Sequence, residues 1–204
     1  MDEIIGAIES KGVDMDGIYR ISGNLVEVQK VRHQVDHGKH SFKDCDIHVL
    51  CGALKTFFRE LEEPLVPFSL HQDFLVTTTI ADKVKRLQCT QELLKRMPVA
   101  HRETLRTLMS HLIRVIKQSA QNRMNVQNIA LVFGPNIMRS NPLNEANTGF
   151  NPHIITQNIL VEYILTNYKD LFSFPSDFIY NEKWLESQKW AIEEVGENII
   201  YAHL

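Results

Sequence analysis

The feature that most constrains the fold of this chain is the spacing of its apolar residues. Between residues 47 and 61 they recur in steps of three and four, and they are Ile47, Leu50, Leu54, Phe57 and Leu61. This spacing places them on one face of an α-helix, whereas strict alternation would indicate a strand. Pro64 and Pro67 follow and end the helix. Similar spacing along most of the chain predicts an all-α fold.

Further helices are predicted on both sides of this one. The first covers residues 25 to 35, with Leu25 in its apolar stripe, and is opened by the cap Asn24 and closed at Gly38. Others are expected over about 69 to 80 with Ser69 as cap, 83 to 96, 98 to 116, 125 to 133 ending before Gly134, and 154 to 168 with Ile155 and Ile159 in its apolar stripe. Residues 140 to 152 are rich in Asn, Pro and Gly and are expected to form a loop.

Size and charge exclude several classes of function. With 204 residues, of which 44% are hydrophobic, the chain can bury the core of a single domain. Its 22 basic and 25 acidic residues give a formal charge of −3. Sequence-independent binding of nucleic acid or anionic membranes needs a concentrated basic face, so neither partner is expected.

The cysteines and the hydropathy pattern predict a soluble, cytoplasmic protein. Cys45, Cys51 and Cys89 are odd in number and form no CxxC pair, which argues against a disulfide framework and a zinc site. No apolar run reaches the roughly 18 residues that a membrane span needs, and the N-terminus lacks the pattern of a signal peptide.

One short segment, residues 16 to 24, interrupts the amphipathic rhythm. Its sequence is DGIYRISGN, in which two glycines enclose the middle and the cap Asn24 ends it. Such a segment predicts a tight connection whose isoleucines, Ile18 and Ile21, point inward while Arg20 projects outward. An arginine on a braced loop is a positioned cation.

Lys55 and Arg59 form a second candidate group. They lie four residues apart on the predicted helix, away from its apolar stripe and on one face with His48 and Gly52. Two adjacent cations require an anionic or carbonyl-rich neighbour, either in a partner or within the chain, where the acidic pair at 62 and 63 could serve.

Two asparagines form a third candidate group. Asn128 and Asn136 flank the apolar run from Ile129 to Phe133. Because Asn136 follows Gly134 and Pro135, we expect the helix to have ended there and the side chain of Asn136 to be exposed.

Together these segments resemble a known family. The stretches GIYRISG at 17 to 23, LKTFFRELEEPL at 54 to 65 and NRMNVQNIALVFGPNIM at 122 to 138 resemble three signature blocks of the Rho GTPase-activating protein (RhoGAP) domain, in the family's order and spacing. The resemblance covers about residues 3 to 172. It implies a single all-α, multi-helix RhoGAP-like bundle over residues 1 to 172, followed by an extra C-terminal tail, residues 173 to 204, that we expect to be helical.

The resemblance also implies a function and a set of site residues. The chain would be a GTPase activator, not itself an enzyme, that binds a GTP-loaded Rho-family small GTPase. Arg20 would be the catalytic arginine finger, Lys55 and Arg59 would support its loop and contact the partner, and Asn136 would reach the GTPase near its switch regions. Of the two cations, we expect Arg59 to brace the loop and Lys55 to meet the partner. GTP and magnesium belong to the partner, so no cofactor or metal is expected, and the chain is expected to be a monomer. The residues that shape the same face would be Arg123, Asn128 and Asn158.

Alternatives remain open at this point. The chain could be a catalytically weak RhoGAP-like binding module, or a helical scaffold that engages a partner without stimulating hydrolysis. The histidines at 33, 37 and 40 have a spacing that can hold zinc, but a solvated helix face is favoured. Cys51 with the nearby His48 suggests a thiol nucleophile, although a small core residue is the better interpretation.

The tail allows two interpretations. Its apolar residues keep helical spacing, so it either docks on the body or offers a helix to a partner. Family members usually carry a further segment before the first helix. We therefore expect Ile4, Ile5 and Ile8 to be exposed without it, and the tail to fold back over them.

Overall fold

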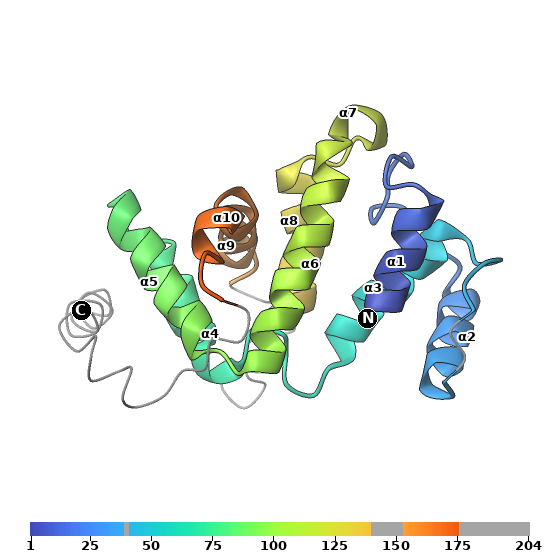
Figure 1. Ribbon diagram of the computed structural model, residues 1–204, viewed down its shortest axis with the longest axis horizontal. Helices are drawn as coiled ribbons and strands as arrows, with labels where there is room; N and C mark the ends of the chain where they lie inside the picture. The colour runs from blue at the N-terminus through green and yellow to red at the C-terminus, as the bar shows by residue number, and fades with distance from the viewer. Residues whose placement is uncertain (39–40, 140–152, 176–204) are drawn as a thin grey trace.

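The computed structural model describes residues 1–38, 41–139 and 153–175 (Figure 1). These residues form α-helices joined by turns, and they contain no strand, so the predicted all-α class is confirmed. The helices are α1 (Asp2–Lys11), α2 (Leu25–Asp36), α3 (Ile47–Glu60), α4 (Phe68–Thr77), α5 (Lys83–Arg96), α6 (Val99–Lys117), α7 (Ser119–Asn122), α8 (Val126–Ile137), α9 (Ile154–Thr166) and α10 (Tyr168–Leu171).

The long helix α6 runs through the middle of the molecule (Figure 1). On one side of it α3 packs against α1 and α2, and on the other side α5 packs against α4 and α10. Helices α8 and α9 pack against each other and against α6, and α8 also contacts α3. The loop between α1 and α2 thereby lies beside the turn at α7 (Figure 1).

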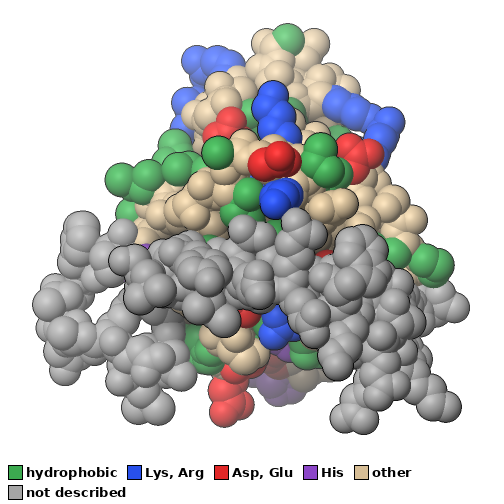
Figure 2. Space-filling view, turned by 90° about the vertical axis from the view of Figure 1, so that its left-hand side faces the viewer, with side chains coloured by type: hydrophobic (Ala, Val, Ile, Leu, Met, Phe, Trp, Pro, Cys, Tyr) green, Lys and Arg blue, Asp and Glu red, His purple; other side chains and the backbone are tan. Residues whose placement is uncertain are grey.

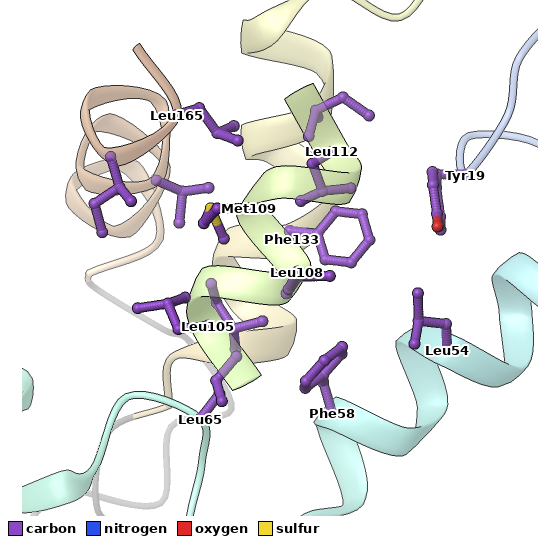
Figure 3. Close-up of a cluster of buried hydrophobic side chains, with 14 of the residues drawn as sticks. Tyr19, Leu54, Phe58, Leu65, Leu105, Leu108, Met109, Leu112, Phe133 and Leu165 are labelled. Carbon is purple, nitrogen blue, oxygen red and sulfur yellow. The ribbon is translucent and has the colours of Figure 1, made fainter. Parts of the chain in front are cut away.

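The core forms where α3, α6 and α8 meet (Figure 3). Leu108 and Leu112 of α6 face Phe133 of α8, while Leu54 and Phe58 approach from α3, and all five side chains are fully buried. Burial of this much apolar surface is the main force that holds the helices together. Tyr19 of the α1–α2 loop points into the same cluster (Figure 3).

Side-chain caps open four of the described helices, namely α2, α3, α5 and α8. Asn24 caps α2 as predicted, because its Oδ1 accepts hydrogen bonds from the main-chain N–H groups of residues 26 and 27. The predicted cap Ser69 is wrong, since α4 begins one residue earlier, at Phe68. The carboxylate of Glu63 accepts the N–H of Phe68 instead, at 2.6 Å. The helix also ends at Thr77, short of the predicted residue 80.

The predicted end of the helix before Gly134 is also wrong. Helix α8 continues through Pro135 to Ile137, and the N–H of Met138 still bonds to the carbonyl oxygen of Gly134 at 3.1 Å. Pro135 sits in the last turn, where its missing N–H removes one bond but does not interrupt the helix.

Several residues assigned to buried stripes are instead exposed. Leu25 is 69% exposed, Phe57 is 42% exposed and Ile155 is 70% exposed. Ile159 is exposed as well. Each of these helices carries apolar residues on more than one side, and its packing partners bury the neighbouring side. The side chains that are buried there include Val28 and Val31 of α2, Phe58 of α3, and Leu160, Val161 and Ile164 of α9.

The two ends of the described body differ from expectation. Ile4, Ile5 and Ile8 are buried in the core, so the apolar surface that the tail was expected to cover does not exist there. The tail prediction itself concerns residues 176–204, which lie outside the described residues.

Phe174 is packed into the body, and Arg106 donates hydrogen bonds to the carbonyl oxygens of Phe172 and Phe174. The packed body therefore extends past the predicted boundary at 172.

The face seen in Figure 2 carries no concentration of one charge sign among its described side chains. Basic and acidic groups are interspersed there. Pairs such as Arg96 with Asp73 at 3.6 Å and Lys95 with Glu92 at 2.8 Å lie on α4 and α5. Within the described ranges, no helix is both long enough and apolar enough to cross a membrane.

Candidate functional site

The α1–α2 loop places one cation in solvent directly after two buried residues. Ile18 and Tyr19 are fully buried, whereas Arg20 is exposed. A tight turn causes this change from buried to exposed. In it, the N–H groups of Arg20 and Ile21 both bond to the carbonyl oxygen of Gly17, at 2.9 and 2.8 Å. Gly17 has a φ of 66°, which glycine adopts without strain. Ile21 was expected to point inward, but it is 44% exposed.

The segment after α6 holds the beginning of the loop. The N–H of Gly17 bonds to the carbonyl oxygen of Asn122 at 2.9 Å, and the guanidinium of Arg123 makes a two-pronged ion pair with the carboxylate of Asp16. That ion pair lowers the pKa of Asp16, and Arg20 acts in the same direction. Arg123 adopts a left-handed conformation, with a φ of 60°, which the adjacent turn imposes.

Asn122 organises this turn from inside the protein. Its side chain is fully buried, and its Nδ2 donates to the carbonyl oxygens of Val13 and Val115, both at 2.8 Å. Its Oδ1 accepts the N–H of Met124 at 2.8 Å. One amide group therefore links the start of the loop, the end of α6 and the approach to α8. Sequence reasoning missed Asn122, although it lies in the NRMN stretch.

Asn128 supports Arg123 from α8. Its Nδ2 donates to the carbonyl oxygen of Arg123 at 3.0 Å, and its N–H is capped by Oδ1 of Asn125 at 2.9 Å. Two predicted site residues, Arg123 and Asn128, thus belong to one bracing assembly beside Arg20.

Lys55 and Arg59 have the reverse of the expected arrangement. The ammonium of Lys55 donates to the carbonyl oxygen of Tyr19 at 2.6 Å, so Lys55 braces the loop. Arg59 is exposed, and its guanidinium donates a hydrogen bond to the hydroxyl of Thr56 on its own helix, at 3.4 Å. Burial lowers the pKa of Lys55, with Arg59 acting in the same direction. The expectation that Arg59 holds the loop is therefore wrong.

The remaining predicted residues lie on α8 and α9. Asn136 occupies the last turn of α8, is half-buried, and donates from Nδ2 to the carbonyl oxygen of Val132 at 2.6 Å. It was expected to be exposed beyond the helix end, which is wrong because the helix includes it. Asn158 on α9 packs against Gly134, where its Oδ1 is buried and accepts no hydrogen bond from the described residues. Asn158 thus belongs to the α8–α9 contact.

Several apolar residues close to Arg20 in the sequence are exposed. They are Met15, Ile21, Leu25 and Val26, each between 44% and 69% exposed. A charged group within an exposed apolar border is typical of a protein-binding surface. Leu25 was predicted to be buried because it continues the apolar stripe of its helix. That apolar residue instead belongs to this exposed border.

Within the part of the chain that the structure describes, the other chemical candidates do not form a site. Burial raises the pKa of Cys51 to about 12, which leaves the thiol protonated and unreactive at neutral pH. Among the described residues, no group of three or more His, Cys, Asp or Glu side chains is arranged to hold a metal ion. His40, the third histidine of the zinc alternative, lies outside those residues.

Comparison with known proteins finds relatives in one family. Residues 1–142 match the RhoGAP domain family. The chain is 43% identical over 176 residues to Rho GTPase-activating protein 27 of Homo sapiens, which covers 84% of this chain and 20% of that protein. It is 38% identical over 179 residues to Rho GTPase-activating protein 15 of Mus musculus, which covers 86% of this chain and 37% of that protein. The chain therefore spans less than half the length of these relatives.

Two solved structures share the fold. The crystal structure of human Rho GTPase activating protein 15 has a TM-score of 0.77 and 37% identity, and covers 84% of this chain and 82% of that one. The BH domain from GRAF, the GTPase regulator associated with focal adhesion kinase, has a TM-score of 0.75 and 29% identity, and covers 85% of this chain and 92% of that one.

Proposed function

Because this chain belongs to the RhoGAP domain family, we propose that it activates a Rho-family small GTPase by inserting Arg20 into the GTPase active site. The partner is the GTP-bound form, and it supplies the nucleotide and magnesium. The chain itself contributes a positioned guanidinium and carries out no reaction alone.

One observation carries this proposal: Arg20 is exposed while the loop residues just before it are held by α3 and by the segment after α6. Lys55 holds the carbonyl of the preceding residue, and Asn122 with Arg123 holds the loop at Gly17 and Asp16. The backbone of such a loop loses little further freedom on binding. Interactions of a preorganised group with developing charge lower a reaction barrier most effectively.

The chemistry of GTP hydrolysis suits this cation. Charge develops between the β- and γ-phosphates, and a planar guanidinium can donate two parallel hydrogen bonds to phosphate oxygens. For the related GTPase Ras, an activating protein raises the rate by about 10⁵-fold, or roughly 7 kcal/mol, of which the arginine finger supplies a large part.

The other site residues take supporting roles in this proposal. Lys55, Arg123 and Asn128 hold the loop through the bonds described above. Arg59 and Asn136 contact the partner from α3 and α8, two helices that pack against each other. The apolar border at Ile21, Leu25 and Val26 adds area to the same interface.

Single-turnover GTP hydrolysis tests the proposal. Several Rho-family GTPases are loaded with GTP and mixed with increasing amounts of the chain, which yields a saturating rate and a half-saturating concentration. We expect Arg20→Ala to lower the saturating rate at least about a hundredfold and to change half-saturation far less, because the finger acts mainly in the transition state. Arg20→Lys should recover little, since an ammonium cannot form the planar fork.

Arg96→Ala is the matched control, because Arg96 is a surface arginine on α5 that pairs with Asp73. It should leave both quantities unchanged. Full activity of Arg20→Ala would overturn the arginine-finger mechanism. Binding of a GTPase without faster hydrolysis would favour the non-stimulating binding module, and the absence of any preference for the GTP form would favour the scaffold.

A further inference from the structure

Tyr19, the residue before Arg20, is held in an unusual conformation. Its φ is 65°, in the left-handed region that bulky L-residues rarely adopt. Its side chain is fully buried, and its ring meets Phe133 edge-on with centroids 5.0 Å apart (Figure 3). The surrounding structure must hold this conformation, because the residue would not favour it alone.

A chain of hydrogen bonds reaches the hydroxyl of Tyr19 from two helices. The hydroxyl lies 2.5 Å from Nε2 of His111 on α6, and Nδ1 of His111 lies 2.6 Å from Oε1 of Glu9 on α1. Oε1 of Glu9 also accepts from Nε of Arg114 at 2.7 Å. The side chain of His111 is fully buried, so it depends on these two partners for its hydrogen bonds.

The direction of each bond follows from the chemistry of the groups. The pKa of Glu9 is lowered by its bonds to His111 and Arg114, although burial opposes them, so its carboxylate is ionised and can only accept. Nδ1 of His111 must therefore carry the proton. In neutral histidine Nε2 is then an acceptor, and the hydroxyl of Tyr19 donates to it. Burial raises the pKa of Tyr19, which keeps this hydroxyl protonated.

Tyr19 is thus fixed at both ends. Its carbonyl is held by Lys55 of α3, and its hydroxyl is held by His111, which Glu9 orients. With ring and carbonyl both fixed, the direction in which the chain leaves Tyr19 toward Arg20 is fixed as well.

We infer that Glu9 and His111 are positioning residues for Arg20, which act through the hydroxyl of Tyr19. This inference rests on the proposed function, because it assumes that the placement of Arg20 limits the rate. The two residues never touch the nucleotide. They narrow the range of positions open to the finger, and small misplacements of a catalytic group cost large factors in rate.

The test uses the same single-turnover assay with Tyr19→Phe, which removes the hydroxyl and keeps the ring. We expect its saturating rate to fall about tenfold with less than a twofold change in half-saturation. Tyr168→Phe on α10 is the matched control and should change neither. Glu9→Ala should reproduce the loss, while Glu9→Gln, which keeps an acceptor oxygen, should restore most of the rate. The Tyr19→Phe/Glu9→Ala double variant should be no slower than the slower single variant.

Thermal unfolding of every variant separates positioning from stability. The side chain of Glu9 is 30% exposed, so Glu9→Ala leaves no internal cavity and keeps the test valid if Tyr19→Phe folds poorly. A full saturating rate in both variants, with only a lower unfolding midpoint, would overturn the inference. If the wild-type chain does not stimulate hydrolysis, or Arg20→Ala loses nothing, the proposed function fails and this inference fails with it. Dependence on Arg20 combined with indifference to Tyr19→Phe and Glu9→Ala overturns this inference alone.

Discussion

The ammonium of Lys55 lies 2.6 Å from the carbonyl oxygen of Tyr19, and this bond ties the loop that carries Arg20 to helix α3. The donor and acceptor are 36 residues apart in the chain. Lys55 is half-buried, so its ammonium has few other partners that could replace this oxygen. The position of the loop therefore depends on a bond that no local sequence feature of the loop provides.

Removing that bond should lower the stimulated rate of GTP hydrolysis more than the affinity for the GTPase. Lys55→Met keeps most of the side-chain stem and removes the ammonium. We expect it to lower the saturating single-turnover rate about tenfold or more, because the loop loses a brace. Arg59→Ala should instead raise the half-saturating concentration, and more strongly at low salt, because exposed cations act by long-range attraction. Similar effects of both variants at every salt concentration would contradict this assignment.

The difference between these two residues shows what the sequence could and could not predict about the site. Arg20 was identified as an exposed cation because its turn residues and the Asn24 cap are local signals. The roles of Lys55 and Arg59 depend on which one reaches a distant carbonyl, and their spacing on a helix does not contain that information. The same holds for Asn122, whose amide joins Val13 and Val115 across the fold.

Asn122→Ala should destabilise the protein strongly. The variant leaves the carbonyl oxygen of Val13 and the N–H of Met124 without their present partner, whereas the carbonyl oxygen of Val115 keeps the N–H of Gln118 at 3.0 Å. Unpaired buried polar groups cost about 1–3 kcal/mol each, so we expect the free energy of unfolding in urea to fall by about 3 kcal/mol. Asn167→Ala is the control, since Asn167 is half-buried and makes one side-chain bond, to Tyr163, and it should cost about 1 kcal/mol. Equal losses in the two variants would rule out the organising role of Asn122.

A methyl group at Gly134 should force α8 and α9 apart. An added Cβ there would lie 2.3 Å from Oδ1 of Asn158 and 3.3 Å from its main-chain nitrogen. We expect Gly134→Ala to lower the free energy of unfolding by about 1–3 kcal/mol, and Asn158→Ala in the same chain to restore part of it.

Gly6→Ala is the matched control for Gly134→Ala, because Gly6 lies within α1 and nothing would lie within 4 Å of its added Cβ. It should raise stability by about 0.5–1 kcal/mol through helix propensity alone. Stabilisation by both substitutions would show that the α8–α9 contact tolerates the larger residue.

The core shows the same limit of sequence reasoning. Helix positions and the all-α class follow from periodicity, which depends on each helix separately. Phe57 was placed in the core by that rule, yet Phe58 is the buried one. Both are phenylalanine, and the choice between them is made by where α8 and α6 lie against α3. Such packing is a property of the whole fold.

The stability of the protein should fall as the pH drops below about 6.5. Burial lowers the pKa of His111 from its ordinary value of 6.5, and Arg114 acts in the same direction, whereas Glu9 opposes the shift without overcoming it. The unfolded chain therefore takes up this proton at a higher pH than the folded chain. As the pH falls through 6.5 the unfolded state binds more protons, and the free energy of unfolding decreases until the folded pKa of His111 is reached. Glu9 has a lowered pKa of its own, and it adds a loss only below about pH 4.5.

Urea unfolding of the wild type and His111→Gln at pH 7.5, 6.5 and 5.5 measures this contribution. The glutamine variant should be less stable at pH 7.5, because it fits the pair Tyr19 and Glu9 less well, but its stability should depend less on pH. The eight other histidines are present in both proteins, so the difference between the two curves isolates His111. We expect the difference in the free energy of unfolding between the two proteins to become smaller as the pH falls. The wild type loses the stability that its neutral imidazole provides, whereas the variant has no imidazole at this position. Parallel curves would mean that His111 takes up its proton equally readily in the folded and unfolded chains, and that burial between α1, α6 and the loop leaves its pKa unchanged.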